Sequence, residues 1–101
     1  MTAEQKLQIL KADLQLLTSV HDAYLSKLLE MGEAAIRREG IDLKPDDVEC
    51  DMAVVHYAAY LFRCRAAQSS GANDYTVMPR YLRYELNNLL FSQKARQDDD
   101  V

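Results

Sequence analysis

Apolar residues recur at helical spacing in four stretches of the chain, and short polar connections separate these stretches. The first stretch follows Thr2, a residue that can cap a helix, and Gln5 stands three positions later, as in a capping box. Leucines then recur at intervals of three and four residues. This pattern predicts a short helix over about residues 3–12.

The second stretch has an apolar arc that is wider than one neighbouring helix can bury. It follows Thr18 and Ser19, either of which can cap a helix, and it stops at Gly40, which suits a left-handed cap. We predict a helix over about residues 20–39 with two partners. Its apolar positions form two adjoining stripes, one of Val20, Tyr24, Leu28, Met31 and Ala35, the other of Leu25, Leu29 and Ile36.

The third stretch is apolar on almost every side, from Val48 to about Gln68. Pro45 and the acidic residues that follow it are typical of a helix N-terminus, where they match the helix dipole. A helix that is apolar all round is enclosed by its neighbours, so we predict that this one is central. The segment SSGAND, residues 69–74, is predicted to be a polar loop.

The last predicted helix, from Pro79 to about residue 94, has two different sides. Four leucines within about 100° of arc should join the core; they are Leu82, Leu86, Leu89 and Leu90. The opposite side carries Arg80, Tyr81, Tyr84, Asn88 and Phe91, with Arg83 beside them. Aromatic residues and arginine are enriched at protein interfaces, so we predict that this side binds another chain. The alternative is that it covers the N-terminal segment of its own chain.

The composition is that of one small folded domain. The chain has 101 residues, of which 49% are hydrophobic and 28% charged, which is typical of a globular protein. We therefore predict a single all-α domain over residues 1–101, built as a bundle of about four helices. A short N-terminal helix, two long antiparallel helices and a short C-terminal helix make up this bundle, and residues 95–101 should form a frayed acidic tail.

Charge and hydropathy restrict the partners and the compartment. The formal charge of -4 argues against wrapping duplex DNA, which requires a basic surface. No apolar run approaches the roughly twenty residues that cross a bilayer, and no basic leader directs export. Cys50 and Cys64 would lie too far apart on one helix for a disulfide, which favours reduced thiols in a cytosolic compartment.

The usual catalytic and metal-binding motifs do not occur in the sequence, so we predict no catalytic residue, cofactor or metal. His56 is interpreted as a hydrogen-bonded core or interface residue rather than a ligand. The acids of residues 46–51 lack the spacing of a calcium loop and fit a helix start. A reactive thiol at Cys50 stays open as an alternative, although the neighbouring acids oppose it.

Several segments resemble the small head-tail connector proteins of tailed bacteriophages and prophages. They are "EQKLQILKADLQL", "AAIRREGI", "MAVVHYAAYLFRCR" and above all "MPRYLRYELNNLLFSQK", and together they cover the chain to about residue 94. The most characteristic element of that family is a final helix that Met-Pro-Arg introduces and that ends in Asn-Asn-x-Leu-Phe. Here it reads Met78, Pro79, Arg80, then Asn87, Asn88, Leu90 and Phe91.

The resemblance implies a structural protomer that performs no reaction. Such proteins form a ring below the portal, extend the channel for the genome, and offer a docking place to the tail or a stopper protein. The implied partners are copies of the chain, the portal protein and the tail, while DNA passes through without specific binding. The implied locations are the cytoplasm of the bacterial host during assembly and then the virion.

A ring uses head-to-tail contacts, so each protomer needs two different adhesive patches. The predicted patches are the second helix, through Leu25, Leu29 and Ile36, and the outer side of the last helix. Two rival functions are weighed against this one. The first is a small helical nucleic-acid-binding adaptor that uses the arginines of the last two helices, and the second is an enzyme or thiol sensor centred on Cys50 or His56.

Overall fold

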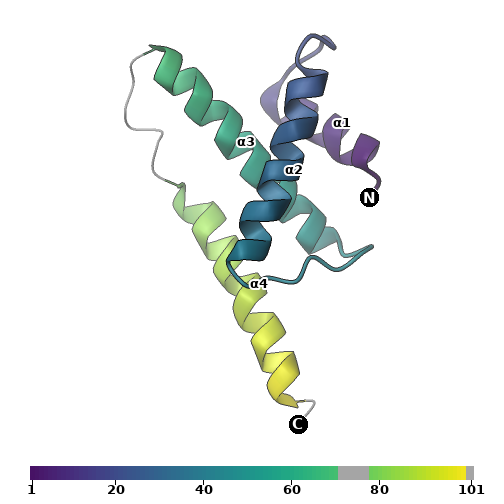
Figure 1. Cartoon of the computed structure of the whole chain (residues 1–101), viewed down its shortest axis with the longest axis vertical. Helices are drawn as coiled ribbons and strands as arrows, with labels where there is room; N and C mark the ends of the chain where they lie inside the picture. The colour runs from purple at the N-terminus through teal and green to yellow at the C-terminus, as the bar shows by residue number, and fades with distance from the viewer. Residues whose placement is uncertain (71–77, 100–101) are drawn as a thin grey trace.

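The computed structural model describes residues 1–70 and 78–99 and contains four α-helices in these ranges. They are α1 (Ala3–Leu14), α2 (Asp22–Arg38), α3 (Val48–Ser70) and α4 (Arg80–Asp99) (Figure 1). The described residues form no strand, so the predicted all-α bundle is confirmed. Of the loop predicted at residues 69–74, the first two residues end α3 and the others lie outside the described residues.

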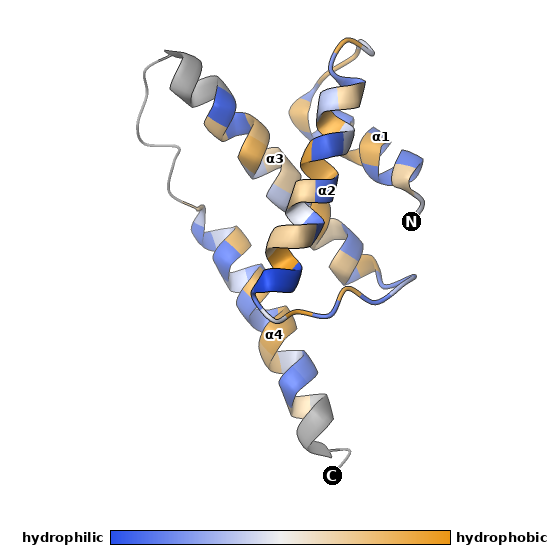
Figure 2. Ribbon diagram, in the orientation of Figure 1, coloured by the Kyte–Doolittle hydropathy of each residue, from blue (hydrophilic) through white to orange (hydrophobic). Residues whose placement is uncertain are grey.

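The helix at the centre of the fold is α3, as its sequence predicts. It packs against α1, α2 and α4, and it runs diagonally through the molecule (Figure 1). In Figure 2 its middle turns are mostly pale or orange, in keeping with a helix that neighbours cover on several sides. It runs in the opposite sense to α2 and crosses it, which confirms the predicted antiparallel pair.

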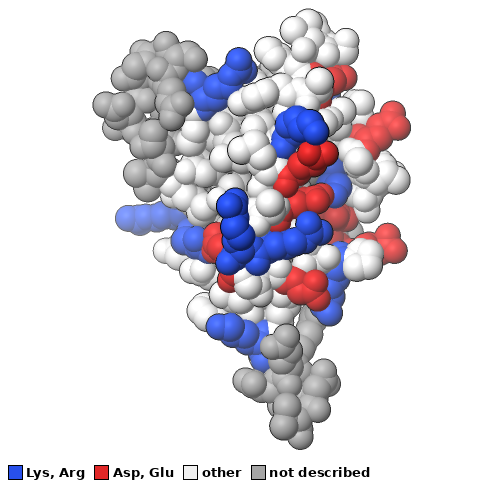
Figure 3. All heavy atoms as spheres, viewed as in Figure 1, with Lys and Arg blue, Asp and Glu red and all other residues white. Residues whose placement is uncertain are grey.

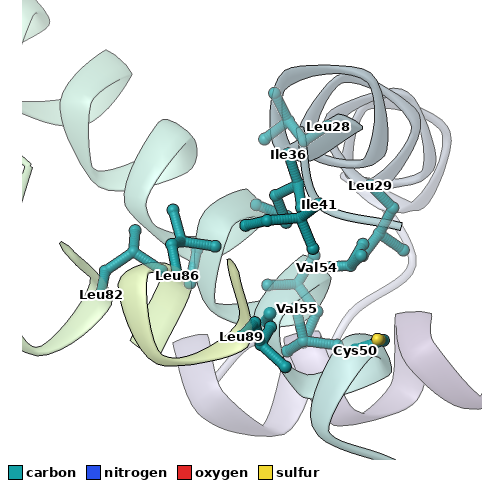
Figure 4. Close-up of a cluster of buried hydrophobic side chains, with 14 of the residues drawn as sticks. Leu28, Leu29, Ile36, Ile41, Cys50, Val54, Val55, Leu82, Leu86 and Leu89 are labelled. Carbon is teal, nitrogen blue, oxygen red and sulfur yellow. The ribbon is translucent and has the colours of Figure 1, made fainter. Parts of the chain in front are cut away.

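The hydrophobic core unites all four helices (Figure 4). From α4 it takes Leu82, Leu86 and Leu89, and Leu90 packs against it while partly exposed, so the predicted leucine stripe is confirmed. The other buried apolar residues are Leu10, Leu25, Leu28, Leu29, Ile36, Ile41, Cys50, Ala53, Val54, Val55, Ala58 and Ala59.

The ends of the first two helices show which capping signals the chain uses. Thr2 and Gln5 form the predicted capping box, with N–O distances of 2.9 and 3.1 Å.

The prediction that Thr18 or Ser19 caps the second helix is wrong, because α2 begins at Asp22 with His21 in the N-cap position and no capping side chain. An ion pair of 2.9 Å between Lys11 and Asp22 ties this end to α1 instead. Gly40 adopts the predicted left-handed conformation, with φ of +93°.

The start of α3 lies three residues after the proline that marks it in the sequence. Pro45 is outside the helix, and Asp46 has a positive φ of 58°. The carboxylate of Asp47 accepts hydrogen bonds from the backbone N–H groups of Glu49 and Cys50, at 3.0 and 3.3 Å. Asp47 therefore caps α3, because it satisfies two of the donors that the first turn leaves without helical partners.

Replacing Asp47 with alanine should destabilise the protein by about 1 kcal/mol, because the two N–H groups lose their acceptor. Urea denaturation checks this value. Asp47→Asn is the matched control, since its side-chain oxygen can still accept both bonds, and it should stay close to the parent. Equal losses in the two variants would contradict the capping role.

The last helix is longer than its sequence pattern predicts. It has 20 residues and ends at Asp99, so the prediction of a short helix is wrong. Residues 94–97 are lysine, alanine, arginine and glutamine, which are good helix formers, and they continue the helix. The side-chain amide of Gln93 also pairs with the backbone N–H and C=O of Asp42, at 2.9 and 2.6 Å. The final turns of α4 project beyond the other helices (Figure 1).

Candidate interaction groove between α3 and α4

The stripe on α2 that was predicted to bind a partner belongs to the core. Leu25, Leu29 and Ile36 are buried in the protomer itself, so their assignment to an interface is wrong. The reason is that α1 and α3 both pack against α2 and cover its wide apolar arc. The two partners that the sequence requires for this helix are thus found within one chain.

The outer side of α4 is exposed, as predicted. Tyr81, Tyr84 and Phe91 are 51%, 62% and 63% exposed, and Asn88 is exposed as well. We call these four residues the outer face of α4. They follow one another at intervals of three, four and three residues, which is the spacing of a helix that packs along another helix. The outer face does not cover the chain's own N-terminal segment, and its binding to another chain stays a prediction.

Beside the outer face lies a groove between the start of α3 and the middle of α4. It has a volume of about 740 Å³, which is in the range of ligand and peptide pockets. The lining residues are Val48, Glu49 and Met52 from α3 and Tyr81, Tyr84, Glu85, Asn88, Leu89 and Ser92 from α4. The groove and the outer face therefore form one continuous surface.

The contribution of α3 to this surface was not predicted from the sequence. Val48 and Met52 were expected to be enclosed by neighbouring helices, but Val48 is 62% exposed. The signal was present, because both residues belong to the first turns of an apolar helix whose acidic residues already mark an exposed end. The spacing of apolar residues within α3 does not reveal that α4 diverges from the start of α3 and leaves the groove between them.

His56 joins α3 to α4 at one side of the groove. Its Nδ1 atom lies 2.8 Å from Oε2 of Glu85, and its ring meets the ring of Tyr81 edge to face, with centroids 6.1 Å apart. This geometry agrees with the interpretation of His56 as a hydrogen-bonded residue. Because Tyr81 and Glu85 line the groove, the contact also fixes the orientation of two lining side chains.

Two of the arginines weighed for a nucleic-acid surface are held in ion pairs within the protomer. Arg83 pairs with Glu39, so it is held within the protomer, while Arg80 is exposed. Arg63 pairs with Asp13 at 3.1 Å. Figure 3 shows several Lys and Arg side chains across the middle and left of the face in view, with acidic side chains mostly to their right.

The thiol of Cys50 has the features of a structural residue. It is buried, and its Sγ lies 3.7 Å from the carbonyl oxygen of Asp42. Burial, above all, and the nearby carboxylates of Asp47 and Asp51 raise the pKa of this thiol above its ordinary value. A raised pKa disfavours the thiolate, which is the nucleophilic form. Cys50 and Cys64 do not form a disulfide, as predicted.

Alkaline pH should destabilise the fold. Burial raises the pKa values of Cys50, Tyr57 and Tyr60 above their ordinary values of 9.0, 10.0 and 10.0. As the pH rises past about 9, the unfolded chain loses protons that the folded chain retains, so the free energy of unfolding falls. Melting temperatures at increasing pH check this, and Cys50→Ala should move the onset of the loss to higher pH. A melting temperature that stays level through the titration of free tyrosine would contradict the prediction.

The described part of the chain holds no group of three His, Cys, Asp or Glu side chains placed to bind a metal ion. None of its helices is long and apolar enough to cross a membrane. Comparison of the chain with family models, with curated proteins and with solved structures gives no significant match.

Proposed function

We propose that this chain is a connector protomer that assembles with copies of itself into a ring on the portal of a tailed phage or prophage. In this role it extends the channel for the genome and offers the tail or a stopper protein a docking surface. The observation that carries the proposal is the exposed outer face of α4 with the adjoining groove. The resemblance of the sequence to such connectors, above all in residues 78–94, supplies the identity of the partners.

The amount and kind of exposed apolar surface support assembly. Isolated apolar side chains are common on monomers, but a continuous patch of aromatic and aliphatic residues marks an interaction site. Here two tyrosines, a valine and a methionine share one groove, and Phe91 extends the patch along α4. Tyrosine and phenylalanine bury large areas at small entropic cost, so they suit the centre of a protein interface.

The net charge of the chain fits a component of a DNA channel better than a protein that binds nucleic acid. The net charge of -4 opposes binding to phosphates, and Arg63 and Arg83 are held in ion pairs with acids of the same chain. A wall that does not attract DNA lets the genome slide past it. The adaptor hypothesis predicts binding that weakens steeply with salt, so the lack of a gel shift with duplex or single-stranded DNA at low salt would remove it.

The double change Tyr84→Ala and Phe91→Ala should weaken assembly and leave the fold intact. Both side chains are mostly exposed in the protomer, so the free energy of unfolding should change by less than about 1 kcal/mol. Light scattering after size exclusion, together with negative-stain images of the protein mixed with portal protein from the same genome, checks assembly.

The matched control is Met31→Ala, which removes an exposed apolar side chain from α2 outside the groove and the outer face. It should assemble as the parent does. A parent protein that stays monomeric and ignores the portal at high concentration would overturn the proposed function. A double variant that unfolds would mean that the outer face is needed inside the protomer.

A further inference from the structure

The outer face of α4 ends in a second edge, on the side of the helix away from the groove. Arg80, Phe91 and Lys94 lie there within about 60° of arc around the helix axis, and all three are exposed. We call these three residues the basic edge of α4. A ring needs two different patches, and the basic edge takes the place of the α2 stripe, which is buried in the core.

Phe91 is the residue of the basic edge that is best suited to bury in a partner. Of the four residues of the outer face, it is the one that does not line the groove of its own protomer. It is also the most exposed aromatic side chain of the described residues. Aromatic anchors at protein interfaces fill pockets on the partner, and the groove, with Val48 and Met52 in its lining, offers an apolar pocket.

The charges of the basic edge and of the groove are complementary. Neither Arg80 nor Lys94 forms an ion pair within the described residues, and from position 80 to position 94 this side of the helix carries no acidic residue. The groove lining includes Glu49 and Glu85 and neither lysine nor arginine. Opposite charge favours pairing of an edge with a groove over pairing of two edges or two grooves.

A contact between the basic edge and the groove must join two molecules. The helix α4 forms one wall of its own groove, so its other edge cannot enter that groove. Arg80 on the basic edge and Glu85 on the groove side are five residues apart, which places them about 140° apart around the helix axis. Because this angle is less than 180°, successive copies turn away from a straight row, and repetition of the contact can close a ring.

We propose that the basic edge of α4 of one copy docks in the groove between α3 and α4 of the next copy. This contact rests on the proposed function in that it specifies how the copies of the ring meet. Phe91 of one copy lies against Val48 and Met52 of the next, and the flanking cations face Glu49 and Glu85. The lengths also agree, since the basic edge covers about 21 Å of helix and the lining residues of α4 cover about 17 Å.

Cysteine pairing between two variants tests the contact directly. Asn87 lies on α4 between Arg80 and Phe91, on the same side of the helix, and Val48 lines the groove. Asn87→Cys and Val48→Cys are purified separately, mixed and oxidised, alone and with portal protein from the same genome, and the products are identified by peptide mass spectrometry. We expect a mixed disulfide between positions 87 and 48.

The matched control for the disulfide is Met31→Cys, at an exposed position of α2 outside both surfaces. Mixed with Asn87→Cys, it should give no disulfide between positions 87 and 31. Disulfides only between like positions, equal yields with positions 48 and 31, or no mixed product in either condition at protein concentrations up to about 1 mM would overturn the proposal.

Charge reversal gives a second readout, the apparent dissociation constant of self-association. Lys94→Glu and Glu49→Lys should each raise this constant at least about tenfold, because each brings like charges together across the contact. The chain that carries both changes should return to within about threefold of the parent, since opposite charges then meet again.

The matched control for charge reversal is Lys27→Glu, which changes an exposed lysine of α2 outside both surfaces. It should leave the constant unchanged. Equal effects of Lys94→Glu and Lys27→Glu, or no recovery in the chain with both changes, would overturn the proposal.

The outcomes for this contact and for the proposed function are separable. A parent that assembles on portal protein while the variants give no mixed disulfide would retain the connector function and refute the contact between basic edge and groove. A mixed disulfide in a protein that ignores portal protein would support the contact and refute the connector function.

Discussion

Replacing Leu86 with alanine should reduce the free energy of unfolding by about 2–5 kcal/mol. Its side chain is 0% exposed and lies in the core with those of Val55 and Ile36, from α3 and α2 (Figure 4). The change removes apolar burial and leaves a cavity, because rigid helices on either side cannot close the space. Since small domains are stable by only about 5–15 kcal/mol, urea denaturation should reveal a large shift of the midpoint.

Tyr84→Ala is the matched control, two residues earlier on the same helix. It removes a larger side chain, but one that is 62% exposed, so its effect on unfolding should stay below about 1 kcal/mol. A comparison of the two variants thus tests which side of α4 is buried, and it requires no measurement of assembly. A loss for Leu86→Ala no greater than that for Tyr84→Ala would contradict the placement of this helix against α3.

The two sides of α4 could be predicted from the sequence because helical geometry fixes them. Once Leu82, Leu86 and Leu89 define the buried side, Tyr81 and Tyr84 must point elsewhere. The same reasoning identified α3 as the central helix. In both cases the prediction concerns one helix and the width of its apolar arc, which the order of residues determines by itself.

Assignments that depend on which element covers a surface could not be made from one helix alone. The wide arc of α2 required two partners, but spacing does not say whether they come from the same chain, and α1 with α3 supplies both. Exposure of Val48 depends on where α4 diverges from α3. Exposure of Leu17 depends on the path of the connection between α1 and α2, which has no helical periodicity from which it could be predicted.

The close approach of α2 and α3 depends on Gly32, a residue that does not belong to the apolar stripes of α2. Gly32 is buried on α2, and a Cβ atom there would lie 3.4 Å from Cβ of Tyr57 and 3.4 Å from the carbonyl oxygen of Val54. Replacing Gly32 with leucine should therefore destabilise the protein by about 3 kcal/mol, because the side chain has no space and must force the two helices apart. Thermal and urea denaturation check this value.

Gly32→Ala is the matched control, because it removes the glycine but adds only one methyl group between α2 and α3. Its methyl group meets the backbone of α3 at the edge of ordinary contact, and alanine favours the helix over glycine by about 1 kcal/mol, so the two effects should nearly cancel. Gly32→Leu adds three further carbons, towards a backbone carbonyl that cannot rotate away. If leucine were tolerated as well as alanine, α2 and α3 would have to lie farther apart than the structure places them, and the core built between them would be a different one.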